Sequence, residues 1–488
     1  ATAKPRDRTD GLLGDAAPRS YPTAIPRPAW FNEERGLSSS LARHLAGLLL
    51  AVCALPFGAQ AAAPQPTHEF TLDNGLKVIV REDHRAPVVV SQIWYKVGSS
   101  YETAGQTGLS HALEHMMFKG SRKLGPGEAS RVLRDLGAEE NAFTSDDYTA
   151  YYQVLAADRL GVAFELEADR LASLRLPPEE FAREIEVIKE ERRLRTDDKP
   201  SGLAYERFKA MAYPASGYSI PTIGWMADLD RMSVQELRHW YETWYVPNNA
   251  TLVVVGDVTA DGVKALAQRY FGAIPKRDVP AAKIPLELAE PGERQITLHL
   301  KTQLPSLMMG FNVPGLATAK NPRDVHALRL IAALLDGGYS ARLATRLERG
   351  EELVSGAGAW YNGYTRGDSL FTISATPNVQ TGKTLEQTEA GIWRELQDLQ
   401  STAPSAEELA RVRAQLIAEL VYDRDSISSQ ATAIGQLETV GLSWKLIDQE
   451  LAELEAVTPA DIQNAAKTYF TRDRLSVAHV LPEEKRDE

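Results

Sequence analysis

The chain has 488 residues, of which 43% are apolar, so it is long enough for two or more domains with buried cores. Its formal net charge of −12 at pH 7 argues against a nucleic-acid partner, because phosphate binding needs a basic surface. The single cysteine, Cys53, lies in a segment that we expect to be removed on export.

Residues 37–61 have the features of a secretory signal. Arg43 and His44 form a basic flank, Leu45–Leu55 is a short apolar core, and Ala59-Gln60-Ala61 is a small-x-small cleavage site. The apolar run is too short to span a bilayer comfortably, and no other segment is both apolar and long enough. We therefore expect no stable membrane insertion.

The mature chain is expected to begin near Ala62. A large exported chain without cysteine suits the bacterial periplasm, which is the localisation we expect. A lipoprotein signal through Cys53 fits less well, since the bulky Val52 stands where a small residue is expected. Residues 1–36 are rich in Pro, Arg and Ala without periodicity, and we interpret them as a disordered or non-native extension.

The segment His111-Ala112-Leu113-Glu114-His115 predicts a metal site on a helix. Positions i and i+4 of a helix lie one turn apart on the same face. Two imidazoles placed there can bind one Zn²⁺ at about 2.0–2.1 Å each. The order H-x-x-E-H is that of the inverted zincin motif, and the Glu114 carboxylate leans toward the same site. The alternative is a helix face that carries two histidines by chance.

A third ligand is expected, because catalytic zinc usually takes three protein ligands and keeps one position for water. No other histidine lies nearby and no thiol is left, so a carboxylate on a second helix is the remaining candidate. Proline placement predicts such a helix from about Pro178 to Thr196. Glu184 and Glu191 lie two turns apart on one face of it. Its other acidic residues are expected to be solvated, namely Glu179, Glu180, Glu186 and Glu190.

The segment HALEHMMFKGS, followed by EIEVIKEERR, resembles peptidase family M16, the group of pitrilysin and the mitochondrial processing peptidase. The resemblance runs from about Phe70 to Leu481 and is stronger in the first half. In that family a glutamate ligand follows the second histidine at a nearly fixed interval, and Glu191 follows His115 by 76 residues.

The resemblance implies a role for each of these residues. His111, His115 and Glu191 would bind one Zn²⁺ per chain, Glu114 would be the general base, and Glu184 would lie in the outer shell. Glu190 is the competing ligand, one residue away in register. A strand containing Asn141, Ala142 and Phe143 would receive an extended peptide substrate along its edge.

The two halves of the chain repeat. Leu237 matches Ile462, Trp244 matches Tyr469 and Leu252 matches Val477, each pair being 225 positions apart. A period that large indicates a duplicated domain. We therefore expect an α+β fold of two homologous domains, each a mainly antiparallel sheet packed with helices on one face. The predicted boundaries are a zinc-binding domain at 62–274, a Pro-rich linker at 275–292 and a second domain without a zinc site at 293–488.

Single-chain M16 enzymes carry an Arg and a Tyr, seven residues apart, that stabilise the oxyanion from the later half. The resemblance places Glu348 and Ser355 at these positions, while Arg349 and Tyr361 are nearby but out of register. A carboxylate repels an oxyanion. In the two-subunit branch of the family one subunit holds zinc and the other completes the site, and this chain is similar to the zinc subunit. A local misalignment is the alternative.

The function expected from these observations is a zinc-dependent endopeptidase that cleaves short or unfolded peptides. Its likeness to the two-subunit branch implies a second M16-like subunit that supplies the Arg/Tyr pair. The alternatives are a non-catalytic M16-like scaffold or assembly subunit, and a structural zinc site without turnover. Structural zinc sites are normally closed by four ligands, often cysteines, and this chain offers three ligands and no thiol.

Overall fold

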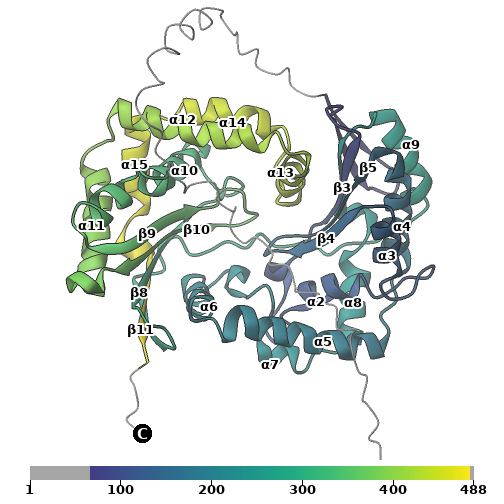
Figure 1. Cartoon of the computed structure of the whole chain (residues 1–488), viewed down its shortest axis with the longest axis horizontal. Coiled ribbons are helices and arrows are strands. Elements are labelled where there is room, and N and C mark those ends of the chain that lie inside the picture. Colours follow the sequence, from purple (N-terminus) through teal and green to yellow (C-terminus); the bar gives the residue numbers. More distant parts are fainter. Residues whose placement is uncertain (1–65, 484–488) are drawn as a thin grey trace, which may run out of the picture. The chain divides into compact units, whose positions relative to one another are not determined.

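The computed structural model describes residues 66–483 of the chain. The expectations for residues 1–36 and for the signal at 37–61 therefore lie outside the described residues. The described part contains two β-sheets with helices packed on them (Figure 1), which confirms the predicted α+β class.

The first sheet has six strands in the order β1-β2-β6-β3-β5-β4, so that β4 is an edge strand. Only β2 and β6 run parallel to each other; the other pairs in this sheet are antiparallel. The central strands carry runs of β-branched and aromatic residues, which favour a sheet that is buried on both faces. The strands span Thr67–Thr71 (β1), Lys77–Glu82 (β2), Val88–Tyr95 (β3), Glu139–Thr144 (β4), Thr149–Ala156 (β5) and Ala250–Gly256 (β6).

The helices of the first half cover one face of this sheet or form a layer beside its β4 edge. α4 packs on β3 and β5, and α9 packs on β2, while α2 lies beside β4 and contacts α5 and α8. Ser233 and Glu236 form a capping box that starts α8. The helices span Leu109–Met116 (α2), Glu128–Asp135 (α3), Leu160–Ser173 (α4), Pro178–Arg192 (α5), Pro200–Ala212 (α6), Met226–Leu229 (α7), Val234–Trp244 (α8) and Ala260–Phe271 (α9).

The second sheet has five strands in the order β7-β11-β8-β10-β9. Its outer strand β7 runs parallel to β11, and the other pairs are antiparallel. This is the arrangement of β2-β6-β3-β5-β4 in the first sheet, so the expectation of two homologous domains is confirmed. The strands span Arg294–Leu300 (β7), Ser306–Val313 (β8), Val354–Tyr361 (β9), Ser369–Pro377 (β10) and Leu475–Pro482 (β11).

The helices of the second half build a separate core with this sheet. α10 packs on β9, α11 packs on β8 and β10, and α15 packs on β8 and α10. The helices span Pro322–Asp336 (α10), Leu385–Ser401 (α11), Ala406–Asp423 (α12), Ile427–Thr439 (α13), Leu446–Glu455 (α14) and Pro459–Tyr469 (α15).

The expectation that helices cover only one face of each sheet is wrong. α13 of the second half packs on β3 and β6 of the first sheet, on the face opposite α4 and α9 (Figure 1). In return, α6 of the first half packs on β7, β8 and β11 of the second sheet. Both contacts need a glycine: a Cβ on Gly435 of α13 would lie 2.1 Å from the Trp94 ring, and one on Gly310 of β8 would lie 2.7 Å from Phe208 of α6.

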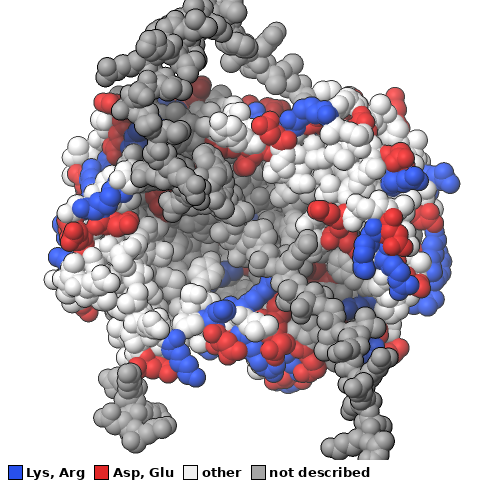
Figure 2. All heavy atoms as spheres, in the orientation of Figure 1, with Lys and Arg blue, Asp and Glu red and all other residues white. Residues whose placement is uncertain are grey.

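The segment that was predicted as a linker, 275–292, falls between α9 and β7 and contains no helix or strand. None of the helices between residues 66 and 483 is long and apolar enough to cross a bilayer. Among the described residues visible in Figure 2, acidic and basic side chains are interspersed rather than gathered by sign.

Candidate metal centre

The start of α2 is fixed from two sides. Gly108 has a φ of 88°, and a Cβ there would lie 2.8 Å from the carbonyl oxygen of Ile223, so only glycine fits. The Glu102 carboxylate accepts hydrogen bonds from the backbone N–H groups of Gly108 and Ser110, both at 2.7 Å. Burial raises the pKa of Glu102 to about 8, against the opposing effect of these hydrogen bonds. This carboxyl therefore anchors the helix that carries the motif.

Three possible metal ligands converge between α2 and α5. The donor atoms of His111, His115 and Glu191 all lie within 4.8 Å of one another. Glu191 Oε2 is 3.3 Å from Nε2 of His115 and 3.6 Å from Nε2 of His111. Two donors at about 2.0–2.1 Å from a tetrahedral zinc ion lie roughly 3.3–3.4 Å apart, so the cluster has the dimensions of a zinc site. Two imidazoles and one carboxylate are also a donor set of catalytic zinc.

Glu184 holds the His115 ring in this orientation. Its Oε1 is 2.9 Å from Nδ1 of His115, which leaves Nε2 facing Glu191. Lys119 pairs with the other oxygen of Glu184 at 2.5 Å, and Arg195 pairs with Oε1 of Glu191 at 2.8 Å. Such outer contacts fix the tautomer and the orientation of ligand side chains.

Charge is unequal between the two histidines. Burial and the neighbouring His115 lower the pKa of His111 to about 3. Burial opposes a charge on His115 as well, but hydrogen bonds to Glu184 and Glu191 outweigh it and raise the pKa of His115 to about 9. Burial likewise opposes the Glu191 charge, yet His115 and His111 lower the pKa of Glu191 to about 2. Both carboxylates thus favour the charged form of the His115 ring, Glu184 at Nδ1 and Glu191 at Nε2.

Glu114 is buried on α2 beside the three possible ligands. Burial raises the pKa of its carboxyl, although the hydroxyl of Thr144, at the end of β4, donates a hydrogen bond to its Oε2. A carboxylate with a raised pKa is suited to accept a proton from water.

Glu190 does not join the cluster. Its side chain is 57% exposed and pairs with Arg193 at 2.9 Å. α5 begins at Pro178 as expected, but the regular helix ends at Arg192 and is followed by a π-helical turn, Arg193–Asp197. The structure therefore brings Glu191, and not Glu190, to the histidines.

The predicted peptide-binding residues lie on the edge strand β4, next to α2. Asn141 Oδ1 accepts a hydrogen bond from the backbone N–H of Ala142 at 2.9 Å, and the Phe143 ring packs edge-on against Trp94 with centroids 5.2 Å apart. The Ala142 side chain is fully buried in the core, so this residue can offer only its backbone to a peptide.

Glu348 and Ser355 are both exposed, at the end of the π-helical turn Leu343–Glu348 and at the start of β9. Arg349 and Tyr361, which lie nearby but out of register, have other contacts. The Arg349 guanidinium lies over the Tyr339 ring at 3.7 Å, and the Tyr361 hydroxyl donates to the Pro314 carbonyl at 2.5 Å.

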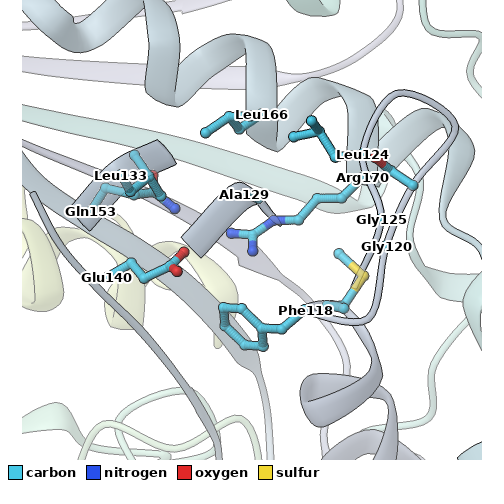
Figure 3. A pocket seen from close by; sticks show the side chains of 12 residues that line it. Phe118, Gly120, Leu124, Gly125, Ala129, Leu133, Glu140, Gln153, Leu166 and Arg170 are labelled. Carbon is cyan, nitrogen blue, oxygen red and sulfur yellow. The ribbon is translucent and has the colours of Figure 1, made fainter. Parts of the chain in front are cut away.

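A small cavity lies behind β4 and apart from the cluster, since no candidate ligand lines it. Figure 3 shows the Arg170 guanidinium directed between the Phe118 ring and the Glu140 carboxylate. Arg170 is buried and paired with Glu167, and it lies 4.8 Å from the centre of the Tyr151 ring. These contacts indicate a packing role for the cavity walls.

Sequence reasoning missed the partners that hold the site. Arg195 follows Glu191, with which it pairs, by four residues, which is a readable signal. Lys119 lies beyond the end of α2 and pairs with Glu184 of α5, so its contact could not be read from spacing. Thr144 left no such signal, because its contact with Glu114 depends on the tertiary fold. The Glu102 contacts reach only six and eight residues along the chain, but they depend on the path of the loop before α2.

Comparison with known proteins identifies the family of the chain. Residues 77–224 match the family model "Insulinase (Peptidase family M16)", and residues 231–416 match "Peptidase M16 inactive domain". The chain is 30% identical over 445 residues to a Helicobacter pylori protein named zinc protease PqqE, covering 90% of this chain and 98% of the relative. The chain belongs to peptidase family M16, which confirms the resemblance found in the sequence.

Two solved structures have the same fold. A protease from Helicobacter pylori superposes with a TM-score of 0.79 and 28% identity, covering 86% of this chain and all of that one. The periplasmic protease PqqL from Escherichia coli superposes with a TM-score of 0.73 and 18% identity, covering 86% of this chain and 48% of that one. At that identity the second match supports the fold alone.

Proposed function

We propose that this chain is a zinc-dependent endopeptidase. The observation that carries the proposal is the convergence of two imidazoles and one carboxylate from two helices, with the buried Glu114 carboxylate beside them. The name zinc protease, given to the Helicobacter relative, supports the metal and the reaction. A peptide that adds as a strand to the β4 edge must be extended, so short or unfolded peptides are the proposed substrates.

His111, His115 and Glu191 would hold one zinc ion, and Glu184 and Arg195 would orient two of these ligands. When bound there, zinc would polarise the substrate carbonyl and lower the pKa of a water molecule. Glu114 would take the proton from the attacking water on Oε1, since its Oε2 accepts from Thr144, and would pass it to the leaving amine. The peptide would add as a strand to the β4 edge, near Asn141 and Phe143.

The proposed active form is a heterodimer in which a second M16-like subunit supplies an Arg/Tyr pair. Support comes from Glu348 and Ser355, which stand where the resemblance places the Arg and the Tyr. Arg349 and Tyr361 do not replace them, because Arg349 lies over Tyr339 and Tyr361 donates to Pro314. Because Glu348 and Ser355 offer no cationic donor, the chain alone would stabilise the oxyanion poorly.

The proposed domain boundaries are residues 62–274 for the zinc-binding domain, 275–292 for the linker and 293–488 for the second domain, which has no zinc site.

The proposed location is the periplasm, supported by the signal-like segment 37–61. N-terminal sequencing of exported material checks this, with a start near Ala62 expected and a full-length chain in the cytosol as the contrary result.

Hydrolysis of a quenched fluorescent peptide tests the function. Activity is expected to disappear with a chelator and to return with Zn²⁺, and to be highest with the partner subunit present. A chain that binds no zinc and cleaves no peptide, with or without a partner, would instead support the non-catalytic scaffold.

A further inference from the structure

The turn between β4 and β5 connects the proposed base to the other half of the chain. Thr144, which donates to Glu114, is the last residue of β4, and the turn continues through Asp147 to β5. The turn is closed by the Ser145 N–H, which donates to the Tyr148 carbonyl at 2.8 Å. Any shift of this turn therefore moves the donor of the Glu114 hydrogen bond.

The first half holds the turn through its backbone. Ser99 and Ser100 donate their N–H groups to the carbonyls of Ser145 and Asp146, at 3.1 and 2.8 Å. A Cβ on Gly98 would lie 2.3 Å from the Ser145 carbonyl oxygen, so the two segments are in direct contact.

The second half reaches the same turn through Arg366, in the loop between β9 and β10. Its backbone N–H donates to Asp147 Oδ2 at 3.0 Å, and its Nε donates to Asp147 Oδ1 at 3.4 Å. Its Nη2 donates to the Ser100 hydroxyl at 2.9 Å, and its guanidinium lies 3.9 Å from the centre of the Tyr101 ring. Both members of this ion pair are buried, with side chains 10% and 5% exposed.

Tyr218 closes the connection between the halves. Its hydroxyl donates to Asp147 Oδ2 at 2.6 Å and accepts from the Gly367 N–H at 2.9 Å. The Asp147 carboxylate thus receives donors from both halves at once. A buried carboxylate that loses its cation is left with a large desolvation penalty, so Asp147 and the turn would rearrange without Arg366.

We propose that Arg366 is a positioning residue for hydrolysis: through Asp147 it fixes the β4–β5 turn, and through Thr144 it fixes the Glu114 carboxylate. The base would then be aligned only while the β9–β10 loop of the second half is docked on the first half. This inference rests on the proposed role of Glu114 as the base.

Two variants of matched burial test the inference in the full chain with zinc and partner. Arg366→Met removes the guanidinium at the turn, whereas Arg342→Met removes a buried guanidinium that pairs with Asp398 and Glu408 inside the second half. We expect Arg366→Met to lower kcat about 10–100-fold with KM and zinc content unchanged, and Arg342→Met to leave kcat within about threefold. Arg366→Lys should recover part of the loss. Loss of zinc or of folding in Arg366→Met alone would overturn the proposal in favour of a purely structural role.

A double substitution separates this route from a general effect. If Arg366 acts through Thr144, Arg366→Met in a Thr144→Val background should cost little further kcat, because the two changes break one chain of contacts. Full additivity of the two losses would contradict the proposal.

Hydrogen exchange provides a readout that needs no activity. The Ser145 amide should exchange about tenfold faster or more in Arg366→Met and at the wild-type rate in Arg342→Met. Equal exchange in Arg366→Met and wild type would overturn the link even if the peptidase is active. An inactive wild-type chain would instead refute the proposed function, and the exchange comparison would still decide the link.

Discussion

Glu184 and His115 are joined by a contact of 2.9 Å between carboxylate Oε1 and ring Nδ1, and the same ring presents Nε2 to Glu191 at 3.3 Å. The ring is thereby fixed before a metal arrives. Metal affinity should therefore depend on a residue that never touches the metal.

Replacing Glu184 by Gln is expected to weaken zinc binding by about 10–100-fold without unfolding the chain. The control is Glu186→Gln on the same helix, whose exposed side chain pairs with Lys189 and faces away from the cluster. Competition titration with a chelator measures both constants. Equal zinc affinity in the two variants would show that Glu184 does not orient the ligand.

Glu191 and Glu190 are one residue apart and give opposite expectations. Glu191→Gln should contain less than one zinc per chain, because the substitution replaces the carboxylate, one of the three proposed ligands, by an amide. Glu190→Gln should keep one zinc per chain, since its exposed side chain pairs with Arg193 and does not belong to the cluster of the two histidines and Glu191. Metal analysis of the dialysed variants decides between the two, and the reverse pattern would make Glu190 the ligand.

The buried Glu102 predicts a pH-dependent stability. Because burial raises the pKa of Glu102 from 4.5 to about 8, the folded state keeps a proton that the unfolded state releases. Stability relative to Glu102→Gln should be fully present below about pH 4.5 and fall between pH 4.5 and 8, by at most about 1.4 kcal/mol per pH unit, then level off. Urea unfolding of both proteins at several pH values measures the difference, and a difference that grows with pH would contradict the assignment.

Glu348 and Ser355 predict that this chain alone is a slow peptidase. Loss of one oxyanion donor costs about 10²–10³ in rate, so a partner with an Arg/Tyr pair should raise kcat by at least that factor. Substituting Glu348→Arg together with Ser355→Tyr should raise the activity of the isolated chain, while Glu351→Arg, also exposed and three residues beyond Glu348, serves as a charge control. Full activity of an isolated monomer or homodimer, with no gain from the partner, would refute the heterodimer.

The features of this structure that depend on spacing along the chain could be predicted from the sequence. The i, i+4 histidines, the proline at the start of α5 and the 225-residue repeat each depend on spacing along the chain, and each corresponds to an element or a topology in the structure. Family membership then added the pairing of α2 with α5.

The remaining features depend on contacts between distant segments. An apolar helix face indicates burial but not which sheet buries it, so the crossing of α6 and α13 to the opposite halves could not be read from their sequences. Arg366 and Asp147 are 219 residues apart. Arg and Asp are usually exposed, so the sequence gives no sign that these two are buried and paired. Ala142 stays a predicted peptide-binding residue through its backbone, but the burial of its side chain in the core depends on how β4 packs and was not predicted.

The most direct test of the account is the paired measurement of zinc content and peptide hydrolysis in wild type and Glu114→Gln. The amide keeps the shape of the side chain and removes the base. The account predicts one zinc per chain in both proteins, together with a loss of about 10²–10⁴ in kcat for the variant when both are measured with the partner present. Hydrolysis near the wild-type rate by zinc-loaded Glu114→Gln would contradict the assignment of Glu114 as the base of a zinc peptidase.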